Sequence, residues 1–416
     1  MFDFFRRKEA PEAQSRPLAA AGTLFTGLDD PGLLEYMRGG SESAAGAYVT
    51  ASKALQNMAL LRCVTLISES IGKLPLNLIE RGDEKRHAVE HPLYRVLKQR
   101  PNNWQTAYEF KRLMQMRVLL HGNAYARVIR SRGQIIRLVP IEPGKVEPIQ
   151  NDDWSVIYRF TRKDGGTIDL PANEVFHLCD LSEDGIKGLS RVKLAKEAIG
   201  IALQAEKAAA KLFKNGVMAG GALSAPNALS DTAFTRLQES LENKSGADQA
   251  HKWMILEEGL TAAKFADTAA DSQHIENRNH QIEEIARAMG VPRPLLMMDD
   301  TSWGSGIEQL GIFFVQYGLD QWFTAWEQAV VRTLLTDDEI EKFYVKFNER
   351  ALLRGTLKDQ AEFFTKALGA GGHHPWMYPN EVRELQELPK ASDPSADKLE
   401  SPLMRKNSNE PAKNPA

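Results

Sequence analysis

The sequence predicts an α+β protein in which a mixed domain of helices and short strands carries two long helices. Between residues 51 and 188, apolar residues recur first at helical spacing and then in short alternating runs typical of antiparallel strands. Residues 189–214 follow with an uninterrupted helical pattern that contains no proline and a single interior glycine. No strand-helix-strand unit repeats, and β structure bracketed by helices is typical of the α+β class.

The domain of residues 51–188 begins with a helical stripe that gives way at Gly72 to an alternating strand pattern. A second helix ends before Pro101, because the residue that precedes a proline is pushed out of the helical conformation. Thr106 is positioned to cap a third helix. The segment after Gly122 predicts a β-hairpin, and four further short runs predict strands.

Residues 189–214 predict one helix about 39 Å long at 1.5 Å per residue. One of its faces carries small side chains, and we expect Ala202, Ala205 and Ala209 to lie against a neighbouring helix that approaches closely. Four lysines on the other faces are either phosphate contacts or, as the nearly neutral chain favours, an ordinary solvated surface: Lys193, Lys207, Lys211 and Lys214.

Residues 215–268 predict a small α/β insertion between this helix and a second long helix at 269–290. The stretch GVPRPLLMMDDTSWGSG then interrupts two helical patterns. We expect an exposed loop, because burial of Asp299 and Asp300 without partners would be unfavourable. Its candidate functional residues are Met297, Met298, Asp299, Asp300, Thr301, Ser302 and Trp303. The alternative is that Met297 and Trp303 pack against the helix that follows.

Composition and charge limit the possible functions. The chain has 416 residues, of which 43% are hydrophobic, and its net charge of −3 argues against a surface that grips phosphates everywhere. Cys63 and Cys179 are the only cysteines, which suggests neither a disulfide framework nor a thiolate zinc site and indicates a reducing compartment. We expect no signal peptide and no membrane span. Residues 1–50 and 391–416 are expected to be flexible.

The common catalytic motifs are absent from the sequence. It contains no phosphate-binding loop, nucleophile elbow, HExxH or GxGxxG pattern, so we expect no catalytic residue, metal or cofactor. The segment His373–Trp376 would need a carboxylate to complete a metal site, and adjacent histidines in a glycine-rich loop usually point apart. The pair Asp299–Asp300 is interpreted as a turn or helix cap. His121 and His177 are interpreted as structural residues.

Several motifs occur in one order between Ala51 and Lys390. They are HPLYRVLKQRPNNWQTAYEF with LLHGNAYARV; EVFHLCDLSEDGIKGLSRVKLAKEAI; LFKNGVMAGGALSAPNALS; IEEIARAMGVPRPLLM with IEQLGIFFVQYGLDQWFTAWEQAV; and FNERALLRGTLKDQAEFFTKAL with NEVRELQEL. This ordered set resembles the portal proteins of tailed bacteriophages, prophages and gene-transfer particles. Two features depart from the family pattern: Thr356 stands where an acidic residue is frequent, and GAGGHHPWMYP is longer than the usual turn.

The resemblance implies a dodecameric ring at one capsid vertex, through which a terminase motor drives double-stranded DNA. The chain segments would take the following parts: a wing (51–188), two stem helices (189–214 and 269–290), a clip (215–268), a tunnel loop (291–305) and a long helix with C-terminal wing or crown helices (306–390). It also implies the terminase large subunit, a head-tail adaptor and the major capsid protein as partners, with Glu257 and Glu258 at the clip interface. The protein would be part of the virion after assembly in the bacterial cytoplasm.

Two other functions remain compatible with the residues alone. The first is a monomeric metal-dependent hydrolase with its site in loops 299–306 or 371–379, which would behave as a particle of 46 kDa. The second is a DNA-binding scaffold without a channel, which would bind free duplex with steep salt dependence. A portal ring would bind free duplex weakly.

Overall fold

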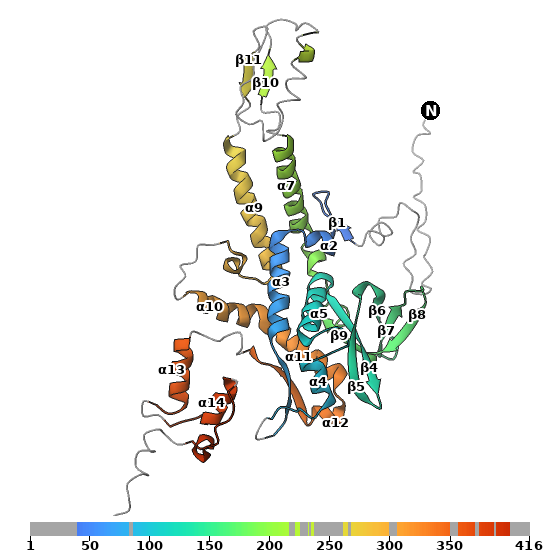
Figure 1. Ribbon diagram of the computed structural model, residues 1–416. Coiled ribbons are helices and arrows are strands. Elements are labelled where there is room, and N and C mark those ends of the chain that lie inside the picture. The colour runs from blue at the N-terminus through green and yellow to red at the C-terminus, as the bar shows by residue number, and fades with distance from the viewer. Residues whose placement is uncertain are drawn as a thin grey trace, which may run out of the picture.

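The computed structural model describes residues 40–82, 86–215, 221–224, 232, 234–236, 261–264, 268–298, 306–349, 357–370, 374–386 and 388–399. Figure 1 shows a body of helices and small sheets from which two helices rise side by side toward a two-stranded sheet. Every pairing between described strands is antiparallel. The predicted α+β class is therefore confirmed.

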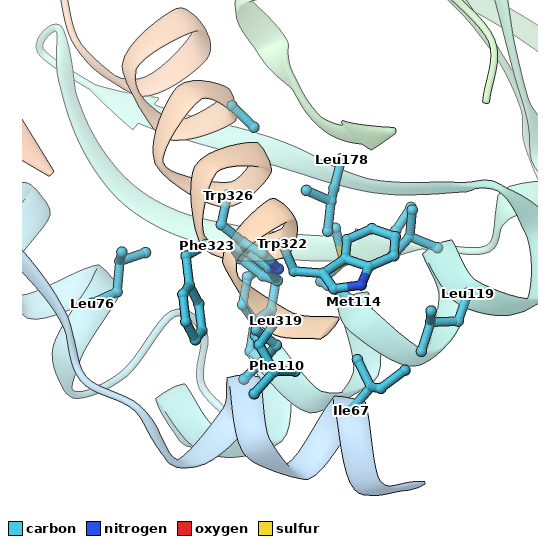
Figure 2. Close-up of a cluster of buried hydrophobic side chains, with 14 of the residues drawn as sticks. Ile67, Leu76, Phe110, Met114, Leu119, Leu178, Leu319, Trp322, Phe323 and Trp326 are labelled. Atoms are coloured by element: carbon cyan, nitrogen blue, oxygen red, sulfur yellow. The ribbon is translucent and has the colours of Figure 1, made fainter. Parts of the chain in front are cut away.

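The main core lies between three helices of the body, α3 (Met58–Lys73), α5 (Ala107–His121) and α11 (Asp320–Leu334). Figure 2 shows their apolar side chains meeting, with Trp326 and Phe323 of α11 among them. The Trp326 indole N–H donates to Gln115 Oε1 at 2.9 Å, so this buried polar group is paired. Shorter elements border the core: α2 (Ala51–Ala54), β3 (Leu76–Glu80) and α4 (Pro92–Lys98).

Helix α5 begins and ends at the residues that the sequence predicted. The Thr106 side chain accepts from the Glu109 backbone N–H, and the Glu109 carboxylate accepts from the Thr106 backbone N–H. Gly122 ends the helix in the left-handed conformation at φ 78°. The direction of the chain into the next strand is fixed by this glycine.

Two three-stranded sheets lie beside the helices. The first has the order β5 (Gln134–Ile141), β4 (Asn123–Ser131), β9 (Val175–Cys179), and the second has the order β6 (Val146–Gln150), β7 (Val156–Thr161), β8 (Thr167–Pro171). The short helices η1 (Pro143–Lys145) and η2 (Ala172–Glu174) connect them. The predicted β4–β5 turn is present, with φ 51° at Arg132 and 82° at Gly133. A small core with Tyr158 and Leu170 joins the two sheets.

Residues 40–50 correct the expectation of a flexible segment from 1 to 50. They form a hairpin of β1 (Gly40–Glu42) and β2 (Tyr48–Thr50) that packs on a long helix. Ser43 is buried there, and the Ala44 N–H donates to Glu197 Oε2 at 2.8 Å. Gly200 leaves the room for this contact, because a Cβ on it would lie 2.2 Å from Ser43 Oγ. Residues 1–39 lie outside the described part.

The single helix predicted at 189–214 is two helices, α6 (Arg191–Leu194) and α7 (Lys196–Asn215). The break lies at Ala195, with φ −91° and ψ 15°. Side chains of α6 bind the body: Ser190 Oγ donates to Leu120 O at 2.6 Å, and Arg191 pairs with Asp180. Tertiary contacts thus fix the first turn and override the helical propensity of the segment. α7 runs beside α9 (Thr268–Met289). The chain segment that connects these two helices contains β10 (Gly221–Ser224), which pairs with β11 (Thr261–Lys264).

The C-terminal part departs from the all-helical expectation for 306–390. The aromatic helix consists of α10 (Gly306–Phe313), the π-helix η5 (Phe314–Leu319) and α11. After α12 (Asp337–Ile340), β12 (Phe343–Phe347) pairs with β3, and its last three residues are buried, exposed and buried in turn. Beyond α13 (Leu357–Ala367) and α14 (Pro379–Leu385), η7 (Pro394–Asp397) contacts α14. Residues 391–399 therefore correct the expectation of a disordered tail.

Candidate functional site at the root of the long helices

The two long helices leave the body where two sequence motifs meet. Gly122, at the end of α5, and Gly188, just before α6, have their backbones in direct contact. A Cβ on Gly188 would lie 2.0 Å from Gly122 O, and a Cβ on Gly122 would lie 2.4 Å from Gly188 O. Asn123 holds the contact, since its Nδ2 donates to Gly188 O and its Oδ1 accepts from Gly188 N, both at 2.8 Å. The position of the α6 helix is thus set by backbone contact.

A buried polar chain extends from this contact into the second sheet. His177 Nε2 donates to Asn123 Oδ1 at 2.9 Å, and Tyr158 O–H donates to His177 Nδ1 at 3.1 Å. Burial, with a smaller effect of Arg332, lowers the pKa of His177 to about 3, so the imidazole is neutral. The interpretation of His177 as a structural residue is consistent with these bonds, although it lies within β9 and not at its end.

Arg191 joins three elements at the same place. Its Nε and terminal nitrogen donate to the two oxygens of Asp180 at 2.6 and 2.9 Å, and the Asp180 side chain is only 6% exposed. The guanidinium also lies 5.1 Å from the centre of the Trp322 ring in α11. A further nitrogen faces Ala288 O and Met289 O at the C-terminus of α9. A cation here is favoured by the helix dipole.

The predicted alanine face of α7 points toward helices of its own chain. Ala202 is buried, and Ala205 and Ala209 line a groove with Met58 of α3 and Ile282 of α9. Small side chains let α9 approach α7 closely. The alanines therefore build the pair of long helices; whether they also contact a second copy stays a prediction.

The loop expected after α9 begins at η4 (Arg293–Leu296), where Gly290 and the prolines end the helix. Met297 follows in the left-handed conformation at φ 61°, and it is 83% exposed. That exposure disagrees with the alternative in which Met297 packs on the next helix. Met298 is half-buried. The other loop candidates, from Asp299 to Trp303, lie outside the described residues.

The helix that follows the loop presents apolar side chains to solvent. Phe313 is 50% exposed and Tyr317 is 65% exposed, and their ring centres lie 4.7 Å apart. On the opposite side, Gly318 of η5 packs so closely on α9 that a Cβ would lie 3.1 Å from Gly290 O. The π-helix thus sits where α10 leaves the body beside the end of α9. Segments of this kind are frequent at functional sites.

The remaining candidate residues do not form a metal-binding group within the described part of the chain. No group of three histidine, cysteine or acidic side chains there could hold a metal ion. His374 is exposed, and His373, Glu257 and Glu258 lie outside the described residues. Burial lowers the pKa of His121. Lys193 and Lys207 are exposed, while nothing is described for the side chains of Lys211 and Lys214. Among described helices, none is long and apolar enough to span a membrane.

Sequence reasoning missed the Arg191 clamp and the π-helix. Asp180 and Arg191 are eleven residues apart on different elements, so no helical or strand spacing connects them. The one available signal was the Asp180 position directly after a buried strand. Gly311 and Gly318, seven residues apart in an apolar helical pattern, were the corresponding signal for an irregular helix.

Comparison with known proteins agrees with this architecture. The sequence model of the family described as phage portal protein matches residues 58–387. The chain is 33% identical over 343 residues to the portal protein of Enterobacteria phage HK97, which covers 80% of this chain and 79% of that protein.

Two solved structures share the fold. The first, the neck of an empty gene transfer agent particle computed with C6 symmetry, contains a chain that matches with a TM-score of 0.58 and 21% identity, over 86% of this chain and 94% of that one. The second, the neck of a native particle computed with C12 symmetry, gives a TM-score of 0.56 and 21% identity, over 80% and 91%. At this identity, these matches support the fold alone.

Proposed function

Because the chain belongs to the phage portal protein family, we propose that its copies form a ring at one capsid vertex and that double-stranded DNA passes through the ring during packaging and ejection. One observation carries this proposal: the family match spans residues 58–387 and includes the two long helices, their root and the helix after the loop. These elements make one body with a protruding stem (Figure 1). The role is structural and does not require a catalytic residue.

A dodecameric ring is the assembly we propose. A related chain occurs in a particle neck computed with C12 symmetry. Cyclic assembly needs two different surfaces on each copy, one for each neighbour. The single chain offers apolar side chains for such surfaces, including Leu194 at 63% and Ile201 at 46% exposure.

The loop after α9 is the part that we propose faces the DNA. Met297 places an exposed thioether at the start of the loop. A thioether can contact DNA without forming an ion pair with a phosphate, as a lysine would. Asp299 and Asp300 would repel phosphates. A chain with net charge −3 also suits a conduit, since many phosphate contacts would slow the passage of DNA.

The insertion carried by α7 and α9 is proposed to contact the terminase large subunit and later the head-tail adaptor, with Glu257 and Glu258 in that interface. The major capsid protein would surround the ring. Assembly would occur in the bacterial cytoplasm, and the finished ring would belong to the virion. These partners follow from the role of a portal, in which a motor and a tail bind one end of the same channel.

The proposal is tested by the oligomeric state of the purified full-length chain. Negative-stain electron microscopy and light scattering should show rings of about twelve copies, in contrast to the 46 kDa particle of a monomeric hydrolase. Free duplex DNA should bind weakly even at low salt, in contrast to a DNA-binding scaffold. In a packaging assay, replacing Asp299 and Asp300 by lysine should slow packaging while rings still form. If rings of this variant package DNA at the normal rate, the loop does not contact DNA in the channel.

A further inference from the structure

The turn between β6 and β7 displays a tryptophan in an unusual way. Trp154 has φ 66°, in the left-handed region that bulky residues rarely adopt, and it is 80% exposed. Among the described large apolar residues, only Met297 is more exposed, and it also has a positive φ. A strained backbone that presents a large apolar side chain to solvent is the kind of outlier that marks a functional position.

The turn itself is rigid. The Asn151 backbone N–H donates to Ser155 O at 2.8 Å, and the Trp154 N–H donates to Asn151 O at 3.0 Å. Side chains close the turn a second time, since Asn151 Nδ2 donates to Ser155 Oγ at 2.9 Å and Ser155 donates to Asp153 Oδ1. These bonds lower the pKa of Asp153, so the carboxylate stays charged. Little backbone entropy of the turn therefore remains to be lost when a partner binds the indole.

No contact within the described chain accounts for the indole position. Trp154 forms no ring contact or side-chain hydrogen bond with any described residue, whereas Trp322 and Trp326 are buried in the core. The neighbouring Asp152 and Asp153 form no ion pair in the described structure. The tip therefore combines an apolar anchor with two acidic side chains, of which Asp153 accepts hydrogen bonds from Ser155. Such a surface fits an apolar pocket that is rimmed by lysine or arginine.

The position of the sheet indicates which neighbour this is. In Figure 1, β6, β7 and β8 form the edge of the body opposite α10, the helix that follows the loop after α9 in the sequence. If that loop faces the ring axis, as proposed above, the sheet lies at the outer circumference. A neighbouring copy would meet the body at its flanks, and the motor would meet the stem. The partner of the outer sheet would therefore be the shell protein that surrounds the ring.

We infer that Trp154, held by the Asn151–Ser155 turn, is an anchor that docks the ring into a basic-rimmed apolar pocket of the surrounding shell subunit. This inference rests on the proposed function, because it requires the ring and its orientation. Aromatic anchors in rigid positions contribute much of the affinity of protein interfaces.

The experiment compares Trp154→Asn with the wild-type chain and with Trp104→Asn. Asparagine removes the indole and tolerates the left-handed conformation, and Trp104 is a second exposed tryptophan, at 63%, with no positive φ. Each full-length chain is expressed with the major capsid protein of the same particle. The number of rings per purified head is measured, together with direct binding of purified rings to that capsid protein. The melting temperature is measured on the same samples.

The expected result is that Trp154→Asn forms rings and melts no lower than wild type, yet enters heads and binds the capsid protein roughly tenfold less well. Trp154→Phe should recover part of the loss, and Trp104→Asn should behave as wild type. Equal incorporation of Trp154→Asn would overturn the inference. If Trp154→Asn fails to form rings, the indole contacts a neighbouring copy of the chain and the inference is overturned. If Trp104→Asn loses as much incorporation and capsid-protein binding as Trp154→Asn, the inference is overturned as well. A wild-type chain that forms no ring would overturn the proposed function itself, before any variant is compared.

Discussion

The backbones of Gly122 and Gly188 touch at the point where the long helices leave the body. The first glycine belongs to the GNAY motif and the second to the GLS motif, and the two glycines are 66 residues apart in the chain. Asn123 and Ser190, the polar residues of these motifs, bond across the same contact. Both motifs are therefore explained by one packing requirement: the stem must start close against the end of α5.

Alanine at either glycine should disrupt this contact. In Gly188→Ala the new Cβ meets backbone atoms of Gly122 and Asp180, which have no side-chain freedom to move, so we expect a loss of stability on the order of 3 kcal/mol. Gly122→Ala adds a left-handed strain of roughly 1–2 kcal/mol. Chemical unfolding measures both. Gly144→Ala is the control, because no atom lies within 4 Å of its Cβ, and it should change stability little.

Removing the Arg191 side chain should leave the Asp180 carboxylate buried without a cationic partner, with only the Leu181 backbone N–H still donating to it. We expect Arg191→Met to destabilise the chain by about 3–5 kcal/mol. Arg191→Lys should recover only part of this, because an ammonium cannot bind both carboxylate oxygens and stack on Trp322. Urea unfolding of each variant checks the order. The surface pair of Arg287 and Glu283 gives the control, since Arg287 is 68% exposed and Arg287→Met should lose at most about 1 kcal/mol.

The buried His177 predicts a pH dependence of stability. Its pKa is lowered to about 3 in the folded chain, while an unfolded histidine titrates near about 6.5. Below that pH the unfolded chain binds the proton and the folded chain does not, so stability is complete above about pH 6.5 and falls by roughly 1.4 kcal/mol per unit as the pH decreases toward 3.

Unfolding measured between about pH 6.5 and 5, before most carboxylates titrate, records this effect together with that of His121, whose pKa burial also lowers. His177→Gln should be less stable near neutral pH and should lose the part of the slope that His177 contributes. The same substitution at exposed His374 should keep it. A slope that His177→Gln leaves unchanged would mean that another group, such as His121, carries the dependence.

Local signals in the sequence predicted the elements that local physics determines. The Thr106 cap, the glycine end of α5 and the turn at Arg132 and Gly133 depend on residues within four positions of each other, and all three are present. The resemblance added the order of the parts. The small side chains of α7 were also recognised from their spacing.

What the sequence could not give are features that depend on distant partners. The break at Ala195 arises because Ser190 and Arg191 bind the body, which helix propensity does not record. The β12 strand forms because β3, more than 250 residues earlier, offers an edge. Likewise the exposure of Trp154 depends on a backbone angle that an Asp-Trp-Ser segment does not require.

The packing of the alanine face of α7 can be tested by replacing alanines with the larger leucine. Ala202 is 4% exposed between α7 and its neighbours, so Ala202→Leu should overpack the site and lower stability by roughly 1–3 kcal/mol. Ala209 lines a groove with open space, so Ala209→Leu should have a smaller effect. Ala208 is exposed on the same helix, and leucine there should change stability by at most about 0.5 kcal/mol. Thermal unfolding of the three variants gives the ranking, and equal values would show that α7 is solvated on all faces.

The π-helix η5 allows a prediction with an internal control, because two glycines of one continuous helical run lie in opposite environments. A Cβ on Gly318 would lie 2.8 Å from the Phe314 ring and 3.1 Å from Gly290 O, so alanine must push η5 away from the end of α9. We expect Gly318→Ala to lower stability by roughly 1–3 kcal/mol. A Cβ on Gly311 meets nothing within 4 Å, so Gly311→Ala should stabilise the chain by about 0.5–1 kcal/mol through its higher helix propensity.

Both variants are measured by chemical unfolding of the same full-length chain, so that helix propensity and packing separate within one element. Opposite signs are the expected outcome. If both alanines stabilise the chain, η5 does not need its close approach to α9, and Gly318 is present for backbone freedom alone. If both destabilise it, the exposed side of α10 is packed in solution, as it would be where neighbouring copies of the chain already cover that face at the concentration of the measurement.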